Sequence, residues 1–198
     1  MATIGLDSLF YAQITENSAG IETYATPIKL AKAMKADLSI ELAEAILYAD
    51  DAASEVVKAF KNGTLSLGID DIGKNAAMAL LGVRTDANGV IISSGEDTAP
   101  PVAIGFRAKK SNGKYRYFWL YRVIFGTPST NLETKGDSVN FQAPTIEGIV
   151  TVRGKPDFEG KHPWKTEVTE GDSGVPASVI EDWFEEVYEP EGEEGGKL

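Results

Sequence analysis

The stretch Val102–Phe125, VAIGFRAKKSNGKYRYFWLYRVIF, decides the fold. Two runs rich in β-branched and aromatic residues flank Asn112-Gly113, and Asn-Gly in this setting is a strong signal for a β-hairpin with a type I′ turn. A two-residue loop fixes which residues face one another across the strands. The predicted pairs are Lys110 with Tyr115, Ala108 with Tyr117, Phe106 with Trp119, Ile104 with Tyr121, and Val102 with Val123. This register predicts one apolar, aromatic face that needs a second layer, and one mixed, basic face.

The sequence on both sides of this hairpin predicts further strands and two helices. Alternating or β-rich runs indicate strands at Phe10–Thr15, Ala36–Ile40, Thr64–Asp70, Val90–Ser93, Thr130–Thr134, Asn140–Arg153 and Trp164–Val168. Asp70 or Asp71 is a candidate N-cap for a helix at about 71–82, which ends at Gly82. Pro176 precedes an amphipathic pattern that predicts a helix at about 176–188. The expected fold is mainly β: an antiparallel sandwich or barrel with one flanking helix and a C-terminal amphipathic helix.

Two segments do not fit clean patterning. Glu41–Phe60 is rich in helix formers, but Asp50-Asp51 interrupts it and its apolar residues form no single stripe, so we interpret about 41–61 as a long, partly structured loop. Met1–Ala12 carries Leu6, Leu9 and Phe10 without an obvious local shelter, which suggests a docking arm. We therefore expect a β domain over 1–170, followed by a C-terminal helix and acidic tail over 171–198.

Composition limits the classes of function. The chain has 198 residues, no cysteine and a net charge of −11, which argues against a disulfide scaffold and against tight DNA binding. No apolar run approaches the roughly 18 residues of a membrane span. The N-terminus has no signal-peptide pattern, so we expect a product made in a cytoplasm.

The sequence contains no constellation typical of catalysis. Asp50-Asp51 and Asp70-Asp71 are interpreted as turn or cap residues, because adjacent side chains point in different directions. His162 is the only histidine and lies in a polar loop. We expect no catalytic, cofactor or metal site. A basic cluster in the central hairpin is interpreted as a solvated or subunit-facing surface, although interleaved aromatics are also typical of single-strand binding.

Ordered short matches along the chain suggest a family. They are Gly5-Leu6-Asp7-Ser8-Leu9-Phe10-Tyr11-Ala12, Thr23-Tyr24, Leu47-Tyr48-Ala49-Asp50-Asp51, Ile69-Asp70-Asp71 with Leu80-Leu81-Gly82, Gly105-Phe106, Tyr117–Gly126 and Pro144-Thr145-Ile146-Glu147-Gly148. Over about Met1–Val168 the chain thereby resembles the major tail proteins, or tail tube proteins, of long-tailed non-contractile bacteriophages. The C-terminal helix and tail lie outside this resemblance.

The resemblance implies a structural virion protein of the phage tail, made in the host bacterial cytoplasm. Such proteins form hexameric rings that stack into a hollow tube around a tape measure protein, and DNA leaves through the lumen without specific binding. The N-terminal arm and long early loop of the family reach neighbouring copies. Carried over, the inter-subunit candidates are Leu6, Leu9, Phe10, Tyr11, Tyr48, Asp50, Asp51, Val56 and Phe60. The alternative is another β-rich virion component, such as a decoration protein or a tail-tip module that binds a receptor or carbohydrate; an enzyme has the least support.

Overall fold

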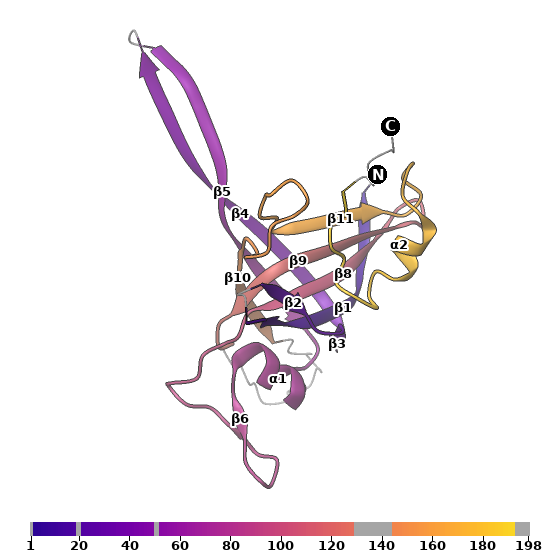
Figure 1. The fold of residues 1–198 in the computed structure, drawn as a ribbon. Helices are drawn as coiled ribbons and strands as arrows, with labels where there is room; N and C mark the ends of the chain where they lie inside the picture. The colour runs from indigo at the N-terminus through magenta and orange to yellow at the C-terminus, as the bar shows by residue number, and fades with distance from the viewer. Residues whose placement is uncertain (1, 19–20, 50–51, 129–143, 193–198) are drawn as a thin grey trace, which may run out of the picture.

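The computed structural model describes residues 2–18, 21–49, 52–128 and 144–192, which form a mainly β structure (Figure 1). The elements are β1 (Thr3–Glu16), β2 (Glu22–Tyr24), β3 (Ile28–Ala31), β4 (Ala33–Ala49), β5 (Ala52–Ile69), α1 (Lys74–Leu81), β6 (Arg84–Thr85), β7 (Ile91–Ile92), β8 (Val102–Lys110), β9 (Tyr115–Phe125), β10 (Thr145–Thr151), β11 (Lys165–Thr169) and α2 (Ala177–Glu181). The expected mainly β, antiparallel fold with a flanking helix is confirmed. The strand predicted at Thr130–Thr134 lies outside the described residues.

The main sheet closes on itself as a barrel. Its antiparallel order is β1-β8-β9-β10-β5-β4, and β3, which precedes β4 by the single residue Lys32, pairs with the other edge of β1. Asp70 joins this seam, because its Oδ1 accepts a hydrogen bond from Lys32 N at 2.8 Å and its own N–H donates to Lys32 O at 3.2 Å. Asp70 and Asp71 therefore do not cap α1, whose N-cap position is Gly73 without a side-chain cap.

The barrel interior is filled by buried apolar side chains from β1, β3, β5, β8, β9 and β10, and partly buried residues of β4 pack against them. The buried side chains include Leu9, Leu30, Leu65, Leu67, Ile69, Val102, Ile104, Phe106, Leu120, Val123, Phe125, Ile146 and Val150. Helix α1 adds Ala76, Ala79 and Leu80 to the same core. Full burial of one such large side chain contributes about 1.5–3 kcal/mol, so this core accounts for the closure of the barrel.

The register of the central hairpin differs from the prediction by one residue. The loop is Ser111–Gly113, in which Lys110 N donates to Lys114 O at 2.8 Å. Among these loop residues only Gly113 has a positive φ, of 84°, as in a type I turn followed by a left-handed residue. The observed pairs are Lys109 with Tyr115, Ala108 with Arg116, Arg107 with Tyr117, Phe106 with Phe118, Gly105 with Trp119 and Ile104 with Leu120; after a bulge, the predicted Val102–Val123 pair is present.

This shift gives the hairpin two apolar faces instead of one. Phe106 and Leu120 face the barrel interior, whereas Tyr117, Trp119 and Tyr121 form a second core on the outside of the wall. Gly105 leaves room for this second core, because a Cβ there would approach the Trp119 ring to 2.7 Å. The predicted mixed, basic face is therefore wrong.

The C-terminal segment covers the outer aromatic face (Figure 1). Helix α2 has five residues and turns follow it, so the predicted helix at about 176–188 is too long. Backbone carbonyls that would accept hydrogen bonds within a longer helix instead accept them from side chains of the barrel wall. Trp119 Nε1 donates to Trp183 O at 2.9 Å, and the Tyr121 hydroxyl donates to Tyr188 O at 2.8 Å. Trp183 and Val187 are buried nevertheless, as their spacing suggested.

The N-terminal residues are not a free arm. Strand β1 pairs with β8 from Thr3 to Gln13. Leu9 and Tyr11 are buried in the barrel, and the ring of Phe10 stacks on that of Phe184 with centroids 4.6 Å apart. The expectation of an unsheltered docking arm is therefore wrong: the shelter comes from β8, which lies far along the sequence.

Candidate assembly surface

The most distinctive surface is the β4–β5 hairpin, which projects from the barrel (Figure 1). The two strands pair from Ala33–Ile69 to Ala49–Ala52, but β10 pairs with β5 only up to Gly63. Beyond the Glu41–Asn62 pair, neither strand pairs with any third strand among the described residues. Apart from residues 50 and 51, which lie outside the described part of the chain, the segment predicted as a long, partly structured loop is a two-stranded ribbon with register shifts after Glu41 and after Leu47. Cross-strand pairing therefore overrides its helix-forming composition.

Both faces of the projecting ribbon expose apolar side chains. Leu42 pairs with Phe60 on one face, while Val57 pairs with Ala45 and so lies on the other. Leu42 is 53% exposed and Val57 is 54% exposed. A hairpin without a third strand or a covering layer is marginally stable in water, so this ribbon is suited to burial against another protein.

Contacts at the base of the ribbon fix it to the barrel. The rings of Phe60 and Trp164 stack with centroids 4.6 Å apart and planes 4° apart, and Trp164 packs against the barrel core. Lys61 Nζ donates to Glu41 Oε1 at 2.7 Å, and this hydrogen bond lowers the pKa of the Glu41 carboxyl. The ribbon therefore leaves the barrel at a position defined by side-chain contacts.

Seven of the nine predicted inter-subunit residues belong to the described part of the chain, and these seven lie in two places. Leu6, Leu9, Phe10 and Tyr11 belong to β1, where Leu9 and Tyr11 are buried and Leu6 packs partly against the core. Phe60 is at the ribbon base. Tyr48 and Val56 lie on the outer part of the ribbon by register, but their side chains are outside the described part of the chain, as are Asp50 and Asp51. The structure thus separates the β1 set from the hairpin set, and it shows that Leu9 and Tyr11 serve the chain's own core.

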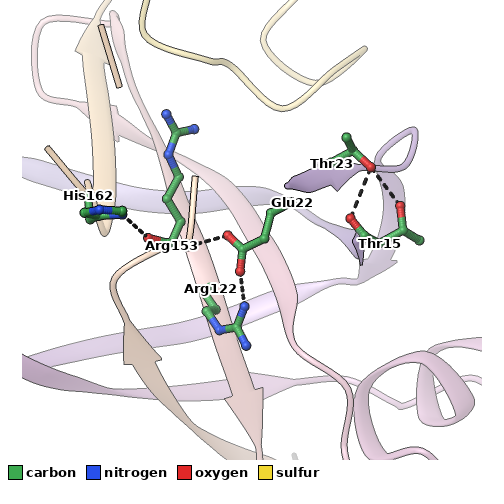
Figure 2. A network of polar contacts seen from close by, with 7 residues as sticks. Thr15, Glu22, Thr23, Arg122, Arg153 and His162 are labelled. Atoms are coloured by element: carbon green, nitrogen blue, oxygen red, sulfur yellow. Dashed lines mark hydrogen bonds and ion pairs between the residues drawn. The ribbon is translucent and has the colours of Figure 1, made fainter. Parts of the chain in front are cut away.

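A buried polar network that the sequence did not predict joins β2, β9 and the segment after β10 (Figure 2). Glu22 is 1% exposed, and its carboxylate accepts hydrogen bonds from Arg122 Nη1 and from Gly154 N, the latter at 2.6 Å. Burial of a carboxylate is tolerated when such partners are present. No motif marks Glu22 in the sequence.

Arg153, next to this network, is also buried, at 1% exposed. Its guanidinium lies 4.6 Å from the centre of the Tyr121 ring, and its Nη1 is 3.8 Å from Glu189 Oε2. The His162 Nδ1 is 3.0 Å from the Arg153 carbonyl oxygen. Burial raises the pKa of Tyr24 to about 12, against the opposing effect of Arg153, and burial also raises the pKa of Tyr121. The pKa values of both tyrosines are raised because their hydroxyl groups are desolvated. They are buried where Arg153 contacts Glu189 and so anchors the C-terminal segment.

The described residues show neither a metal site nor a membrane-spanning helix. Across residues 2–18, 21–49, 52–128 and 144–192, no cluster of three or more histidine or acidic side chains is placed to hold a metal ion. In the same residues, no helix has the length and apolarity needed to cross a membrane. Comparisons with models of protein families and with curated proteins find no match.

Proposed function

We propose that this chain is a structural subunit that assembles with copies of itself into hexameric rings, stacked as the hollow tail tube of a long-tailed non-contractile bacteriophage. In this proposal the tube surrounds a tape measure protein and serves as the conduit for DNA ejection. The subunit acts in the virion tail after synthesis in the bacterial cytoplasm. Ring number and tube identity rest on the sequence resemblance, and the exposed apolar β4–β5 ribbon supports the proposal that copies of the chain assemble.

The observation that carries the proposal is the two-faced apolar ribbon of β4 and β5. Leu42 and Val57 are exposed on opposite faces, so no single layer of the same chain can cover both. The ribbon edges beyond Glu41 and Asn62 also lack strand partners among the described residues. Unpaired strand edges favour aggregation in a monomer but provide ready pairing sites in an assembly.

The charge of the chain supports the role of a conduit. At a net charge of −11 per subunit, a ring of copies produces a negative potential. Such a potential repels DNA phosphates, which favours passage over adhesion. The same charge argues against a tube that holds nucleic acid tightly.

Electron microscopy across a concentration series, with sedimentation in parallel, tests the proposal. We expect hollow rings or tubes that grow with concentration. A closed oligomer of fixed small size that never extends would contradict a tube subunit, as would a chain that remains monomeric at the highest concentration.

A matched pair of variants tests the role of the ribbon. Val57→Lys places a charge on the ribbon, while Val90→Lys makes the same change at a residue of similar exposure, 58%, beside the small β6–β7 hairpin. Val57→Lys should leave the monomer folded by circular dichroism and block assembly, and Val90→Lys should still assemble. Equal effects of the two variants would remove the ribbon as the cause.

A further inference from the structure

A cavity of about 320 Å³ lies between β3 and the first turn of α1. Its walls are Tyr11 of β1, residues 28–30 of β3 and residues 73–76 at the start of α1. The volume falls at the lower end of the range for ligand sites, which is about 300–1,000 Å³. The lining includes two lysines and no acidic residue, although the chain as a whole has a net charge of −11.

The first turn of α1 presents backbone N–H groups to this cavity. The first hydrogen bond within the helix runs from Ala77 N to Gly73 O at 2.9 Å, so the N–H groups of residues 74–76 have no acceptor inside the helix. No side chain caps the helix, and its first turn contains no acidic residue. The preceding carboxylate, that of Asp71, accepts a hydrogen bond from Ile72 N at 2.8 Å instead. The helix terminus therefore offers free donors and the positive end of its dipole.

Tyr11 adds a buried donor from the opposite wall of the cavity. Its side chain is 3% exposed, and its hydroxyl makes no hydrogen bond to another described residue. In the described part of the chain, the side-chain polar atoms that are both fully enclosed and unpartnered belong to Tyr24, Arg153 and Trp183. The Tyr11 hydroxyl is not one of them, so it remains accessible from the cavity that its side chain lines. Burial raises the pKa of Tyr11, which keeps the hydroxyl protonated at neutral pH.

The two lysines make the electrostatic potential at the cavity positive. Neither Lys29 nor Lys74 forms an ion pair with another residue that the structure describes. Lys74 Nζ lies toward the β6–β7 turn, since a Cβ on Gly89 would be 3.3 Å from it. Lys29 belongs to the β3 wall. The ammonium groups thus act on a ligand through their field, which salt screens, while the N–H groups and the hydroxyl are placed for direct contact.

This set of groups distinguishes between classes of ligand. A cation would be repelled by the lysines and by the helix dipole. A neutral ligand would gain nothing from either. A phosphate carries several acceptor oxygens and negative charge, so it can accept from the N–H groups and from the Tyr11 hydroxyl together, and helix N-termini are established binding sites for it. We propose that this cavity binds a phosphate group, either free or as a small phosphate monoester.

This inference goes beyond the proposed function and does not depend on it. The cavity lies within one chain, so binding can be measured on the unassembled protein. A chain that binds phosphate but never forms tubes would contradict only the tube proposal, and a chain that forms tubes without binding phosphate would contradict only this inference.

Calorimetric titration at constant ionic strength tests the inference, with inorganic phosphate and phenyl phosphate as probes and potassium chloride as the control. We expect saturable binding of one phosphate per chain with a Kd of about 1 mM or lower. Tighter binding of phenyl phosphate would assign the site to a monoester whose substituent covers Ile28, and tighter binding of inorganic phosphate would assign it to the free ion. Failure of both probes to saturate, or equal heats from chloride, overturns the proposal.

A matched pair of tyrosine variants locates the binding. Tyr11→Phe keeps the buried ring and removes the hydroxyl from the cavity, whereas Tyr24→Phe removes an unpartnered hydroxyl that does not line it. Tyr11→Phe should weaken Kd about tenfold, as expected for loss of a hydrogen bond to a charged group, and Tyr24→Phe should leave it unchanged. Equal affinities of the two variants would place any binding elsewhere and overturn the proposal.

A second pair, at Lys74, separates the backbone donor from the side-chain charge. Lys74→Ala removes only the ammonium group, and Lys74→Pro also removes the first N–H of the helix. Proline suits this first helical position, because Gly73 before it has the extended backbone that a following proline favours. We expect a small loss of affinity for Lys74→Ala that disappears at high salt, and a larger loss for Lys74→Pro that persists. Equal losses would show that the helix terminus does not contact the phosphate.

Discussion

Removal of the Glu22 carboxylate should destabilise the fold substantially. In the Glu22→Ala variant, Arg122 loses its ion-pair partner and the Gly154 N–H loses its acceptor at 2.6 Å. Breaking a buried pair by removing one partner costs about 3–5 kcal/mol. For a chain of this size each kcal/mol lowers Tm by about 2–4 °C, so we expect Tm to fall by roughly 6–20 °C.

Urea unfolding and calorimetry of three variants measure this effect. Glu22→Ala and Arg122→Met should each lower the free energy of unfolding, while the double variant should lose less than the sum, because neither charge is left alone. Glu16→Ala is the control, since Glu16 is the exposed register partner of Glu22 and its removal should change stability by less than about 0.5 kcal/mol. A loss below about 1 kcal/mol for Glu22→Ala, or strictly additive losses, would refute the coupling.

Three further predictions concern Tyr24, the outer core and the first strand. The pKa of Tyr24 rises from 10.0 to about 12 on folding, so the unfolded chain releases that proton first. The contribution of this pKa shift to the free energy of unfolding is fully present below pH 10 and is lost as pH rises to about 12. Unfolding at alkaline pH, compared between the unaltered chain and Tyr24→Phe, measures this loss. Gly105→Ala should cost about 1–3 kcal/mol, because the new Cβ would approach the Trp119 ring to 2.7 Å. Gly5→Ala, whose Cβ would meet ordinary contacts at 3.8 Å, should be nearly neutral in the same denaturation assay. Deletion of Met1–Ala12 should abolish folding, judged by circular dichroism, because β1 is a wall of the barrel; a folded monomer from that deletion would contradict the pairing of β1 with β8.

The sequence predicted the existence of the central hairpin but not its register. Asn112-Gly113 correctly marks a turn, yet the same dipeptide suits a two-residue loop and a three-residue loop with Gly in the left-handed conformation. That difference of one residue decides whether Trp119 faces inward or outward. The outer aromatic core became visible only with the structure, since the partner of Trp119 is Trp183, 64 residues away.

Other differences share one cause, which is that distant partners override local preference. The helix formers of Glu41–Phe60 pair across a hairpin. The Trp183 carbonyl accepts a hydrogen bond from Trp119 instead of one from the backbone of a longer α2. Glu22 carries no pattern that distinguishes it from a solvated acid, because its partners Arg122 and Gly154 follow 100 and 132 residues later. The periodicity of apolar residues reflects only the local sequence. It therefore identified strands better than it identified which strands pair with one another.

The pairing of β1 with β8 has a consequence for how the chain folds during synthesis. The contact between Asp7 and Arg107 spans 100 residues, so at 5–20 residues per second the ribosome needs about 5–20 s to supply the partner of β1. The β4–β5 hairpin joins strands adjacent in sequence, and hairpins form in about 1–10 μs. The ribbon can therefore form on the nascent chain before the barrel that supports it. During that interval its exposed apolar faces are open to association with neighbouring nascent chains, and the length of the interval depends on translation rather than on the stability of the finished fold.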